Sequence, residues 1–232
     1  NMTLSLLNQL GIKSSFKEDV IKVYPRKSIE KQTVVVESDW SSASYFYSIV
    51  ALAKIGSEIK LSAYKHESLQ GDSCLADIYT HFGVNTIFGH DFITLKKVRV
   101  TTPTPLELDL KNAPDIAQTI AVTCFAEGIR CDLKGLHTLK IKETDRLEAL
   151  KAELKKLGAT ISVTNTSLHL EKSSAIHKNI SITTYNDHRM AMAFAPLAFR
   201  VPIIILNAEV VSKSYQKFWT DMEQIGMVTK EL

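Results

Sequence analysis

Three apolar segments rich in small residues recur at similar intervals along the chain, and an aspartate stands at the beginning of each. The segments are residues 41–53, 116–126 and 190–199, and the aspartates are Asp39, Asp115 and Asp187. Long apolar runs of this kind indicate buried helices. An aspartate before a helix caps its free backbone N–H groups. The pattern therefore predicts three equivalent core helices.

A β-rich run and a second helix follow each of these segments. The runs are 58–63, 130–136 and 201–206, and the second helices are 72–82, 144–157 and 215–225. The second helices end at Gly83, Gly158 and Gly226, and Gly11 belongs to the same series. Glycine is the usual left-handed residue that ends a helix. We therefore predict a repeated unit whose helices stop at glycine.

Paired strand patterns follow two of these glycines, at 84–95 and 159–170. The predicted unit is β-α-β-α-β-β, present three times, with half of a fourth unit at the front. A solenoid is the alternative, but solenoid repeats run about 20 to 50 residues, and this unit is longer. We expect one compact α/β domain at 37–232, in which three units pack around shared helices.

The first 36 residues have a different character. Residues 2–10 show a helical period without a capping residue before it, which predicts that further sequence precedes residue 1. Residues 14–31 are charged and contain few strand-forming residues. We interpret 1–36 as the remnant of a preceding domain and 14–31 as the crossing between the two domains.

Composition and charge exclude several classes of function. The chain has 232 residues, 45% of them hydrophobic and 23% charged, which is typical of a globular protein. Its net charge of +3 leaves no uniform basic field for nucleic acid or an anionic membrane. The longest apolar run, 191–199, is far short of the roughly 20 residues that a spanning helix needs. We expect no nucleic-acid partner and no membrane segment.

Cysteines and histidines give no metal or disulfide pattern. Cys74, Cys124 and Cys131 are odd in number and lack CxxC spacing, which favours buried thiols in a reducing compartment such as the cytoplasm. The seven histidines include no pair at ligand spacing within a helix. We therefore predict a cytoplasmic protein without a bound metal.

Cations stand where the predicted helices begin, which is the unfavourable end for them. Lys142 and Arg146 lie four residues apart, on one helical face if the helix already starts there. Arg189 occupies the first turn of a helix that Asn186 or Asp187 can cap, and Lys213 directly precedes Ser214, the predicted cap of the last helix. A cation at a helix start costs a few tenths to about 1 kcal/mol unless an anion neutralises it.

The alternative for each cation is solvation or pairing with a neighbour, as in Lys142 with Asp145 or Arg189 with Asp187. Three equivalent positions that break the same local preference favour a functional explanation. Backbone N–H groups together with lysine and arginine bind phosphate or carboxylate. The sequence thus predicts an anion site built from several helix starts.

Carboxylates accompany these cations and are candidates for proton transfer. Glu143 follows Lys142, and Asp115 and Asp187 stand at helix starts. The alternative is that both aspartates only cap helices, which is the better interpretation for Asp39 because no basic residue adjoins it. His188, between Asp187 and Arg189, is placed to touch a ligand.

Small polar residues in the first predicted helix leave two interpretations open. Ser41, Ser42 and Ser44 fit either a hydroxyl-rich site or close packing between helices, and Cys124 is more typical of a core position.

Five segments carry a resemblance to a known family. The segments ESDWSSASYF, PDIAQTIAV, KETDRL, YNDHRMAM and VSKSYQKFW resemble those of the 5-enolpyruvylshikimate-3-phosphate synthases, in the same order across essentially the whole chain. The resemblance implies an inverse α/β barrel fold, with two domains of three β-α-β-α-β-β units each. It also implies that the chain holds the end of the N-terminal domain and most of the C-terminal domain.

The resemblance further implies a reaction and roles for single residues. An enolpyruvyl group would move from phosphoenolpyruvate to the 5-hydroxyl of shikimate 3-phosphate, without a cofactor. Arg146, Arg189 and Lys213 match residues that bind phosphoenolpyruvate. Asp115 and Lys142 match residues at the 5-hydroxyl, and Glu143 matches a proton-transfer acid. We add Asp187 and His188 as candidate substrate-binding residues. Thr138 stands where some members carry an asparagine that helps to bind ligand.

Two other functions remain as alternatives. One is the related enolpyruvyl transferase that acts on UDP-N-acetylglucosamine, and the other is a non-catalytic α/β module that binds an anionic partner. The family's other substrate-binding segments belong before residue 1. We therefore expect this chain to need the missing N-terminal domain as its partner, and to be inactive alone.

Overall fold

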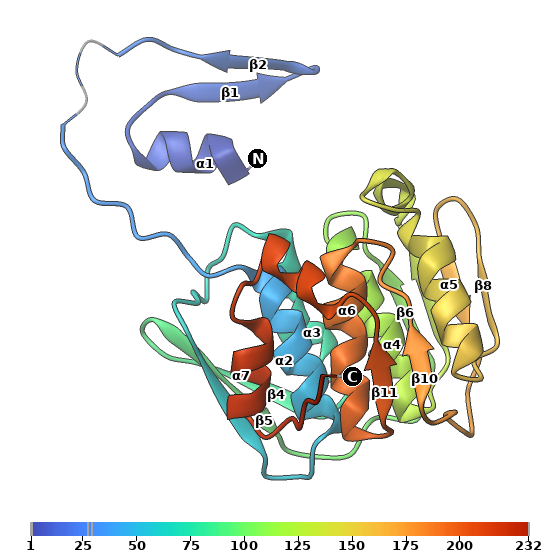
Figure 1. Cartoon of the computed structure of the whole chain (residues 1–232). Helices are drawn as coiled ribbons and strands as arrows, with labels where there is room; N and C mark the ends of the chain where they lie inside the picture. The colour runs from blue at the N-terminus through green and yellow to red at the C-terminus, as the bar shows by residue number, and fades with distance from the viewer. Residues whose placement is uncertain (1, 27, 29, 232) are drawn as a thin grey trace.

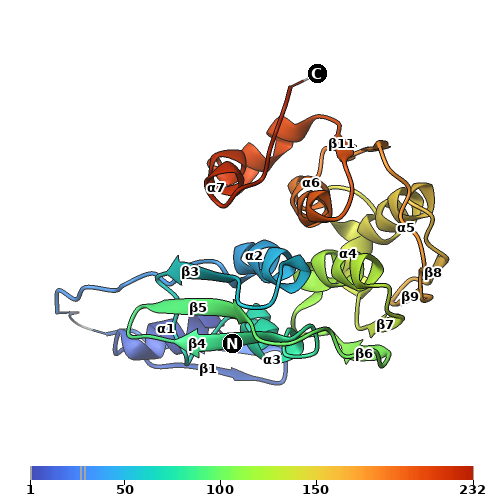
Figure 2. The same cartoon turned by 90° about the horizontal axis from the view of Figure 1, so that it is seen from below.

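Three core helices pack side by side, with β-sheets around them, in the computed structural model, which describes residues 2–26, 28 and 30–231 (Figure 1). The helices are α2 (Trp40–Leu52), α4 (Ala117–Glu127) and α6 (His188–Phe194). Seen along their axes in Figure 2, they occupy the inside while the strands lie outside. The three predicted core helices are confirmed.

Small hydroxyl side chains join these helices. Ser44 Oγ lies 3.0 Å from Thr119 Oγ1, and Thr123 Oγ1 donates to Ser48 Oγ at 2.8 Å, so α2 and α4 bond directly to each other. Short side chains allow this close approach, and each buried hydroxyl finds a partner. Of the two interpretations left open for Ser44, packing is therefore the one that the structure favours.

Within the described residues after α2, the strands form three separate sheets outside the helices. The first has the order β3 (Glu58–Ser62), β5 (Phe92–Lys97), β4 (Val84–Phe88), all antiparallel. The second has the order β6 (Leu106–Asp109), β7 (Cys131–Lys134), β9 (Leu168–Leu170), β8 (Ile161–Val163). The third pairs β10 (Ile180–Ile182) with β11 (Ile203–Ile205). Two pairs, β6–β7 and β10–β11, are parallel, because α4 and α6 carry the chain back between them.

The second helix of each unit lies farther out. They are α5 (Arg146–Lys156), α7 (Phe218–Gln224) and, in the first unit, only the 3₁₀ turn η1 (Gly71–Cys74) followed by α3 (Leu75–Ile78). The prediction of a helix over 72–82 was too long. Hydroxyls of Ser73 and Thr80 bond to carbonyls three residues earlier, which competes with regular helix.

Helix ends follow the sequence closely elsewhere. Gly158 and Gly226 come directly after the caps of α5 and α7, with φ of 103° and 97°, and Gly11 follows the helix Met2–Gln9 with φ of 73°, as their predicted role requires. Gly83 also has a φ of 73°, but α3 already ends at Ile78, so the prediction that Gly83 ends a helix was wrong. The third apolar segment is not one helix, because α6 gives way at Phe194 to the 3₁₀ helix η4 (Ala195–Phe199). Pro196 lacks the N–H that a continuing α-helix would use.

The repeat appears in full in the middle unit, which runs β6-α4-β7-α5-β8-β9. The first unit begins at α2 and the third reaches only α7 within the described residues. Ser38 N nevertheless donates to Ala63 O at 2.7 Å, so the chain before α2 follows the end of β3 as a first strand would. The order of elements is thus as predicted, with strands missing from the outer units.

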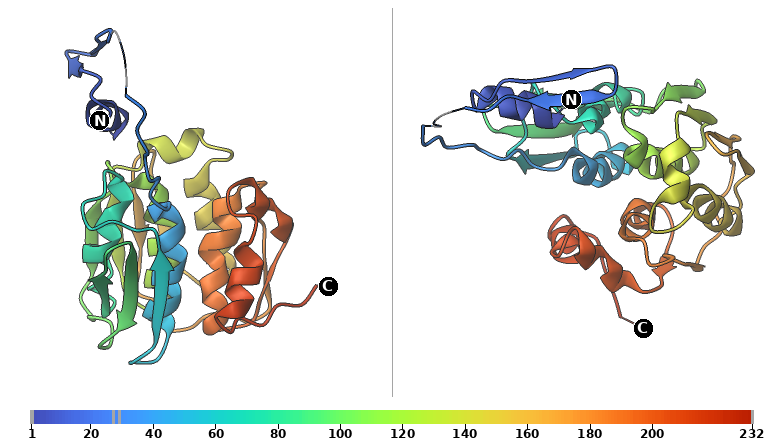
Figure 3. Two further views of the ribbon diagram at one scale, coloured as in Figure 1. Left: turned by 90° about the vertical axis from the view of Figure 1, so that its left-hand side faces the viewer. Right: turned by 90° about the horizontal axis from the view of Figure 1, so that it is seen from above.

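A small segment at the start of the chain lies apart from this body (Figures 1 and 3). It contains α1 (Met2–Gln9), with no buried residue, and a hairpin of β1 (Ser14–Lys17) and β2 (Val20–Val23). The prediction that 14–31 is strand-poor was therefore wrong for its first half. Glu18 and Asp19 form the turn, with φ of 48° and 63°. Hairpin turns with positive φ at both residues usually contain Asn-Gly, and this turn contains neither asparagine nor glycine.

Within the residues that the structure describes, no helix combines the length and the apolar character needed to cross a membrane.

Candidate functional site

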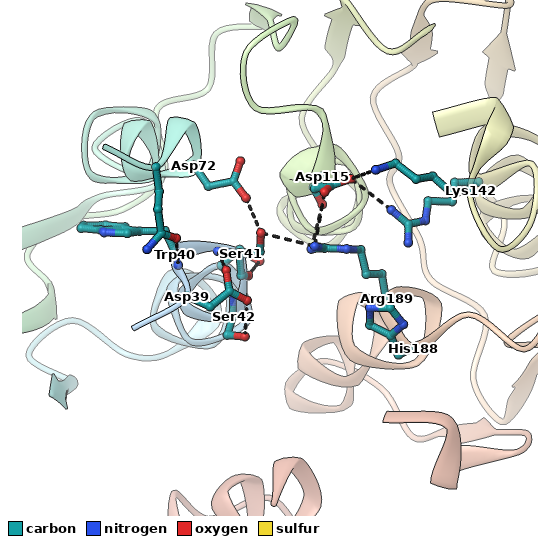
Figure 4. A network of polar contacts seen from close by, with 12 residues as sticks. Asp39, Trp40, Ser41, Ser42, Asp72, Asp115, Lys142, His188 and Arg189 are labelled. Atoms are coloured by element: carbon teal, nitrogen blue, oxygen red, sulfur yellow. Dashed lines mark hydrogen bonds and ion pairs between the residues drawn. The ribbon is translucent and has the colours of Figure 1, made fainter. Parts of the chain in front are cut away.

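The beginnings of α2, α4 and α6 meet at one end of the bundle, and charged side chains converge there (Figure 4). Ser41 comes from α2, Asp115 from η2 (Pro114–Ile116) just before α4, and Arg189 from α6. In Figure 1 the segment of α1, β1 and β2 lies beyond this same end. One residue from each repeated unit therefore contributes to a single cluster.

Arg146 is the buried centre of the cluster. It is the first residue of α5, and only 2% of its surface is exposed. Its Nε donates to Asp187 Oδ2 at 2.6 Å, its Nη2 to Glu143 Oε2 at 2.7 Å and its Nη1 to Asp115 Oδ1 at 3.1 Å. A buried guanidinium is tolerated only when it is paired in this way.

Asp115 links the cations of three elements. Lys142 Nζ lies 3.3 Å from its Oδ1, and Arg189 Nη2 lies 3.4 Å from its Oδ2. Burial alone would raise the pKa of Asp115, but the charges of Arg189, Lys142 and Arg146 together hold it below its ordinary value. Its side chain caps no helix, so the capping interpretation of Asp115 was wrong.

Lys142 and Arg146 do not share a helical face, because α5 begins only at Arg146. Lys142 follows the short helix η3 (His137–Ile141), and its side chain reaches Asp115 from outside α5. The alternative pairing with Asp145 is also wrong: Lys140 is the lysine near that carboxylate, at 3.7 Å. The two predicted cations meet at Asp115 through tertiary structure.

Arg189 points toward α2 and α4 rather than toward its neighbour in sequence. Its Nη2 lies 3.4 Å from Ser41 Oγ, and its Nη1 lies 3.5 Å from the Asp115 carbonyl oxygen. Burial would lower the pKa of Arg189, but nearby acidic groups, including Asp115, raise it. The guanidinium therefore stays charged.

Asp187 has two functions at the start of α6. It accepts the Arg189 backbone N–H at 2.8 Å, which confirms the predicted cap, and it is the closest partner of Arg146. None of its surface is exposed. Asp187 therefore acts on the open site through the two arginines that it holds.

Lys213 approaches the same place by a route that the sequence did not indicate. It ends the short helix η5 (Ala208–Lys213), and α7 begins only at Phe218, so the prediction that it precedes a helix capped by Ser214 was wrong. Its Nζ donates to the carbonyl and side-chain oxygens of Asn186, at 2.8 and 2.9 Å. The ammonium group thus lies beside the start of α6.

Glu143 and His188 form the outer edge of the cluster. Burial would raise the pKa of Glu143, but a backbone hydrogen bond and the charge of Arg146 hold it below its usual value. His188 Nδ1 lies 3.7 Å from Glu143 Oε1 and has no hydrogen-bond partner among the described residues. Burial lowers the pKa of His188, so the ring is neutral near pH 7, and its Nδ1 is free to form a hydrogen bond with a ligand.

A metal at this edge would compete with Arg146. The ligand atoms of Glu143, Asp187 and His188 lie within 4.8 Å of one another. Arg146, however, already donates to both carboxylates.

Thr138, in η3, takes no part in these contacts, and its buried Oγ1 has no hydrogen-bond partner among the described residues.

The sequence did not identify every member of the cluster. Asp72 accepts a short hydrogen bond from Ser41 Oγ, and burial raises the pKa of Asp72. Tyr45 is buried behind the cluster, and burial raises its pKa to about 12. The one feature of the sequence that could have identified Asp72 is its position next to Gly71, at the start of a predicted helix. Ser42 bonds to Asp39 at the helix start instead.

The arrangement suits binding of an anion and transfer of a proton. Lys142 and Arg189 are partly accessible, and Lys213 is exposed. Asp115 is a carboxylate held next to Lys142, and Glu143 is one held next to Arg146. Fixed cations stabilise an anionic ligand or transition state, and adjacent carboxylates move protons.

Comparison with known proteins connects this geometry to a family. The sequence profile of the EPSP synthases (3-phosphoshikimate 1-carboxyvinyltransferases) matches residues 1–222. A 3-phosphoshikimate 1-carboxyvinyltransferase of Bacteroides fragilis is 40% identical over 99% of this chain, and the match covers 56% of that protein. One of Histophilus somni is 32% identical over 97% of the chain and 52% of the relative. The chain thus spans about half the length of these curated relatives.

Solved structures share the fold. The EPSP synthase from Acinetobacter baumannii superimposes with a TM-score of 0.81 over 97% of this chain and 54% of that protein, at 21% sequence identity. The enolpyruvyl transferase NikO from Streptomyces tendae gives 0.67 over 96% of this chain and 52% of its own, at 17% identity. The fold is therefore the inverse α/β barrel that the resemblance implied. On the profile and the identities together, the chain belongs to the EPSP synthase family.

Proposed function

We propose that this chain forms part of an enzyme that transfers the enolpyruvyl group of phosphoenolpyruvate to the 5-hydroxyl of shikimate 3-phosphate and releases phosphate. The observation that carries the proposal is the meeting of Lys142 and Asp115, from separate segments of the middle unit, with Arg189, from the third unit, at one point. Family membership supports the same reaction.

Cations would bind phosphoenolpyruvate in this proposal. Arg189 and Lys213 face its phosphate and carboxylate, and Arg146 joins them when ligand displaces one of its carboxylate partners. Asp187 keeps the two arginines in place, and His188 offers Nδ1 at the edge. Thr138 occupies the position of a ligand-binding asparagine in some members, and its unpartnered hydroxyl is available for that contact.

Proton transfer would fall to the carboxylates. The 5-hydroxyl oxygen bonds to C2 of phosphoenolpyruvate while C3 gains a proton. The C–O bond to phosphate then breaks as C3 returns a proton to the carboxylate, which restores the C2=C3 double bond and leaves the enolpyruvyl group on the 5-oxygen. Asp115 and Lys142 would hold the 5-hydroxyl. With its pKa below the ordinary value, Glu143 is ionised near pH 7, so it must first accept a proton, which the hydroxyl can release.

We also propose a domain assignment. Residues 1–36 would belong to the N-terminal domain of a longer protein, which would supply the rest of the substrate contacts, and residues 37–232 to the C-terminal domain. The separation of α1, β1 and β2 from the body supports this division. The reaction would take place in the cytoplasm, since Cys74, Cys124 and Cys131 all carry free thiols.

A substrate comparison tests the proposal. The natural full-length polypeptide that contains this sequence should release phosphate when phosphoenolpyruvate is supplied with shikimate 3-phosphate. It should release none when UDP-N-acetylglucosamine replaces shikimate 3-phosphate. Release with the nucleotide sugar would support the related transferase, and release with neither substrate would support a non-catalytic module.

The isolated chain of 232 residues should behave differently, because half of the proposed cleft lies outside it. Titration calorimetry with shikimate 3-phosphate should give no saturable heat at micromolar ligand. Tight binding to this chain alone would contradict the division of the site between two domains.

A further inference from the structure

We propose that Asp72 is a positioning residue for Arg189 and acts through the hydroxyl of Ser41. The proposal rests on the proposed function, because it assigns to Asp72 the task of aiming the cation that binds phosphoenolpyruvate. Asp72 belongs to the stretch Gln70-Gly71-Asp72, which joins the start of α2 to the loop before Asp115. Contacts made by all three residues of the stretch carry the argument.

Gln70 fastens the stretch to α2. Its Oε1 accepts the Trp40 backbone N–H at 2.9 Å, and its Nε2 donates to the Ser38 carbonyl at 2.8 Å. Trp40 is the first residue of the helix. A single side chain thus ties residues 70–72 to both sides of Asp39, and the position of Asp72 follows from the position of α2.

Gly71 fastens the stretch to the loop that carries Asp115. A Cβ at this glycine would lie 2.1 Å from the carbonyl oxygen of Asn112. That contact is with backbone, so no side-chain rotation would relieve it. Any larger residue at Gly71 would push the loop before Asp115 away from the stretch. The two acids, Asp72 and Asp115, are held at a fixed separation by this close approach.

Asp72 determines the direction of the hydrogen bonds at Ser41. The Ser41 hydroxyl donates its only proton to Asp72 Oδ2. Its oxygen can therefore act toward Arg189 only as an acceptor, and Arg189 Nη2 lies 3.4 Å away. Figure 4 shows the contacts that run from Asp72 through Ser41 to Arg189, and the contact of the same guanidinium nitrogen with Asp115. Arg189 is thus oriented by acceptors from two units.

Steady-state kinetics of the natural full-length polypeptide test the proposal. Asp72→Ala should raise the KM for phosphoenolpyruvate about tenfold, as expected for a misaligned charge-assisted contact. The kcat and the KM for shikimate 3-phosphate should change less than about threefold. Asp72→Asn should restore most of the affinity, because its amide oxygen can still accept from Ser41. Asp77→Ala, which removes an exposed acid from the adjoining α3, is the control and should match the wild type.

A double variant separates positioning from a loss of stability. Ser41→Ala alone should reproduce the effect of Asp72→Ala, and Ser41→Ala combined with Asp72→Ala should be no worse than either change alone. Additive losses, or equal losses for both substrates in proportion to a lower melting temperature, would overturn the proposal.

Side-chain NMR keeps this test independent of catalysis. The Arg189 Nε–H signal, assigned with Arg189→Lys, should shift in Asp72→Ala and return toward its wild-type position in Asp72→Asn. An unchanged signal in Asp72→Ala would overturn the link even if activity fell. Absence of phosphoenolpyruvate turnover in the wild type would refute the proposed function instead, while the NMR comparison would still decide whether Asp72 orients Arg189.

Discussion

Arg146 carries a full charge inside the protein, and its three carboxylate partners surround it. Asp187, its closest partner, has no exposed surface at all. Removing one member of a buried charge group leaves the others uncompensated, and this costs far more than the group contributes as a whole. The stability of the fold and the geometry of the site therefore depend on the same side chain.

Arg146→Met should lower the free energy of unfolding by about 3 to 5 kcal/mol, because it leaves Asp187 buried without its cation. Lys151→Met is the matched control, since it removes an exposed pair with Glu148 on the same helix. The control should lose less than about 1 kcal/mol. Chemical denaturation of both variants provides the comparison, and similar losses for the two would contradict this description of Arg146.

His169 lies outside the cluster around Arg146, and its ion pairs make the stability of the fold depend on pH. Hydrogen bonds to Asp132 and then to Glu171 raise the pKa of His169. A raised pKa in the folded state gives stabilisation that is complete below the unfolded value of about 6.5 and is lost as pH rises through the folded value. The free-energy difference between the wild type and His169→Gln should thus be largest near pH 6 and shrink toward about pH 9. A difference that stays constant over this range would refute the assignment.

The roles of single residues were predictable from the sequence where a strong local preference, such as helix capping by aspartate, decides them. Asp39 and Asp187 cap helices as their sequence positions indicate. Asp115 does not, because Pro114 starts a 3₁₀ turn that delays α4 and frees the carboxylate for Lys142. Asp72 escaped prediction because its partner, Ser41, is distant in sequence.

At the scale of elements, α5 holds the segment before α6 at two points. Arg146 bonds to Asp187, and two turns later Glu153 accepts Thr183 N–H at 3.1 Å and Tyr185 OH at 2.7 Å. Between Thr183 and Asp187, which α5 holds at these two points, Tyr185 and Asn186 have φ of 53° and 57°. Non-glycine residues in this conformation are strained and persist only where the surroundings hold them. The helix thus fixes the turn that leads to Arg189.

Glu153→Ala should lower the free energy of unfolding by at least about 2 kcal/mol, because it leaves the Thr183 N–H and the Tyr185 hydroxyl without their acceptor. Glu148→Ala, on the exposed face of the same helix, should cost less than about 1 kcal/mol. Urea denaturation measures both. Equal costs within about 0.5 kcal/mol would mean that the buried carboxylate does not hold the turn.

The succession of elements was largely readable from the sequence. Apolar runs marked α2, α4 and α6, and glycines marked the ends of α5 and α7. The hairpin of β1 and β2 was missed because its turn uses Glu18 and Asp19 in place of glycine. The start of α7 was missed because Ser214 resembles a cap but lies in the turn after η5.

At the scale of the molecule, repetition builds the site. Each unit brings one core helix with its start at the same end, so Ser41, Asp115 and Arg189 meet there (Figure 4). From the sequence we predicted that the cations at the helix starts form one anion site. That prediction depended only on their equivalent positions in the repeated units. Which atoms touch could not be predicted, because Lys142 and Lys213 reach the cluster from loops and short 3₁₀ segments.

The most direct test of the central claim compares two arginines from the same unit. Arg189→Ala removes the cation at the start of α6, and Arg200→Ala removes one just after η4 that contacts Glu127. In the natural full-length polypeptide, Arg189→Ala should lower kcat/KM for phosphoenolpyruvate about 100-fold or more, and Arg200→Ala should stay within about threefold of the wild type. If both variants retain wild-type kcat/KM, the helix-start cations do not bind phosphoenolpyruvate.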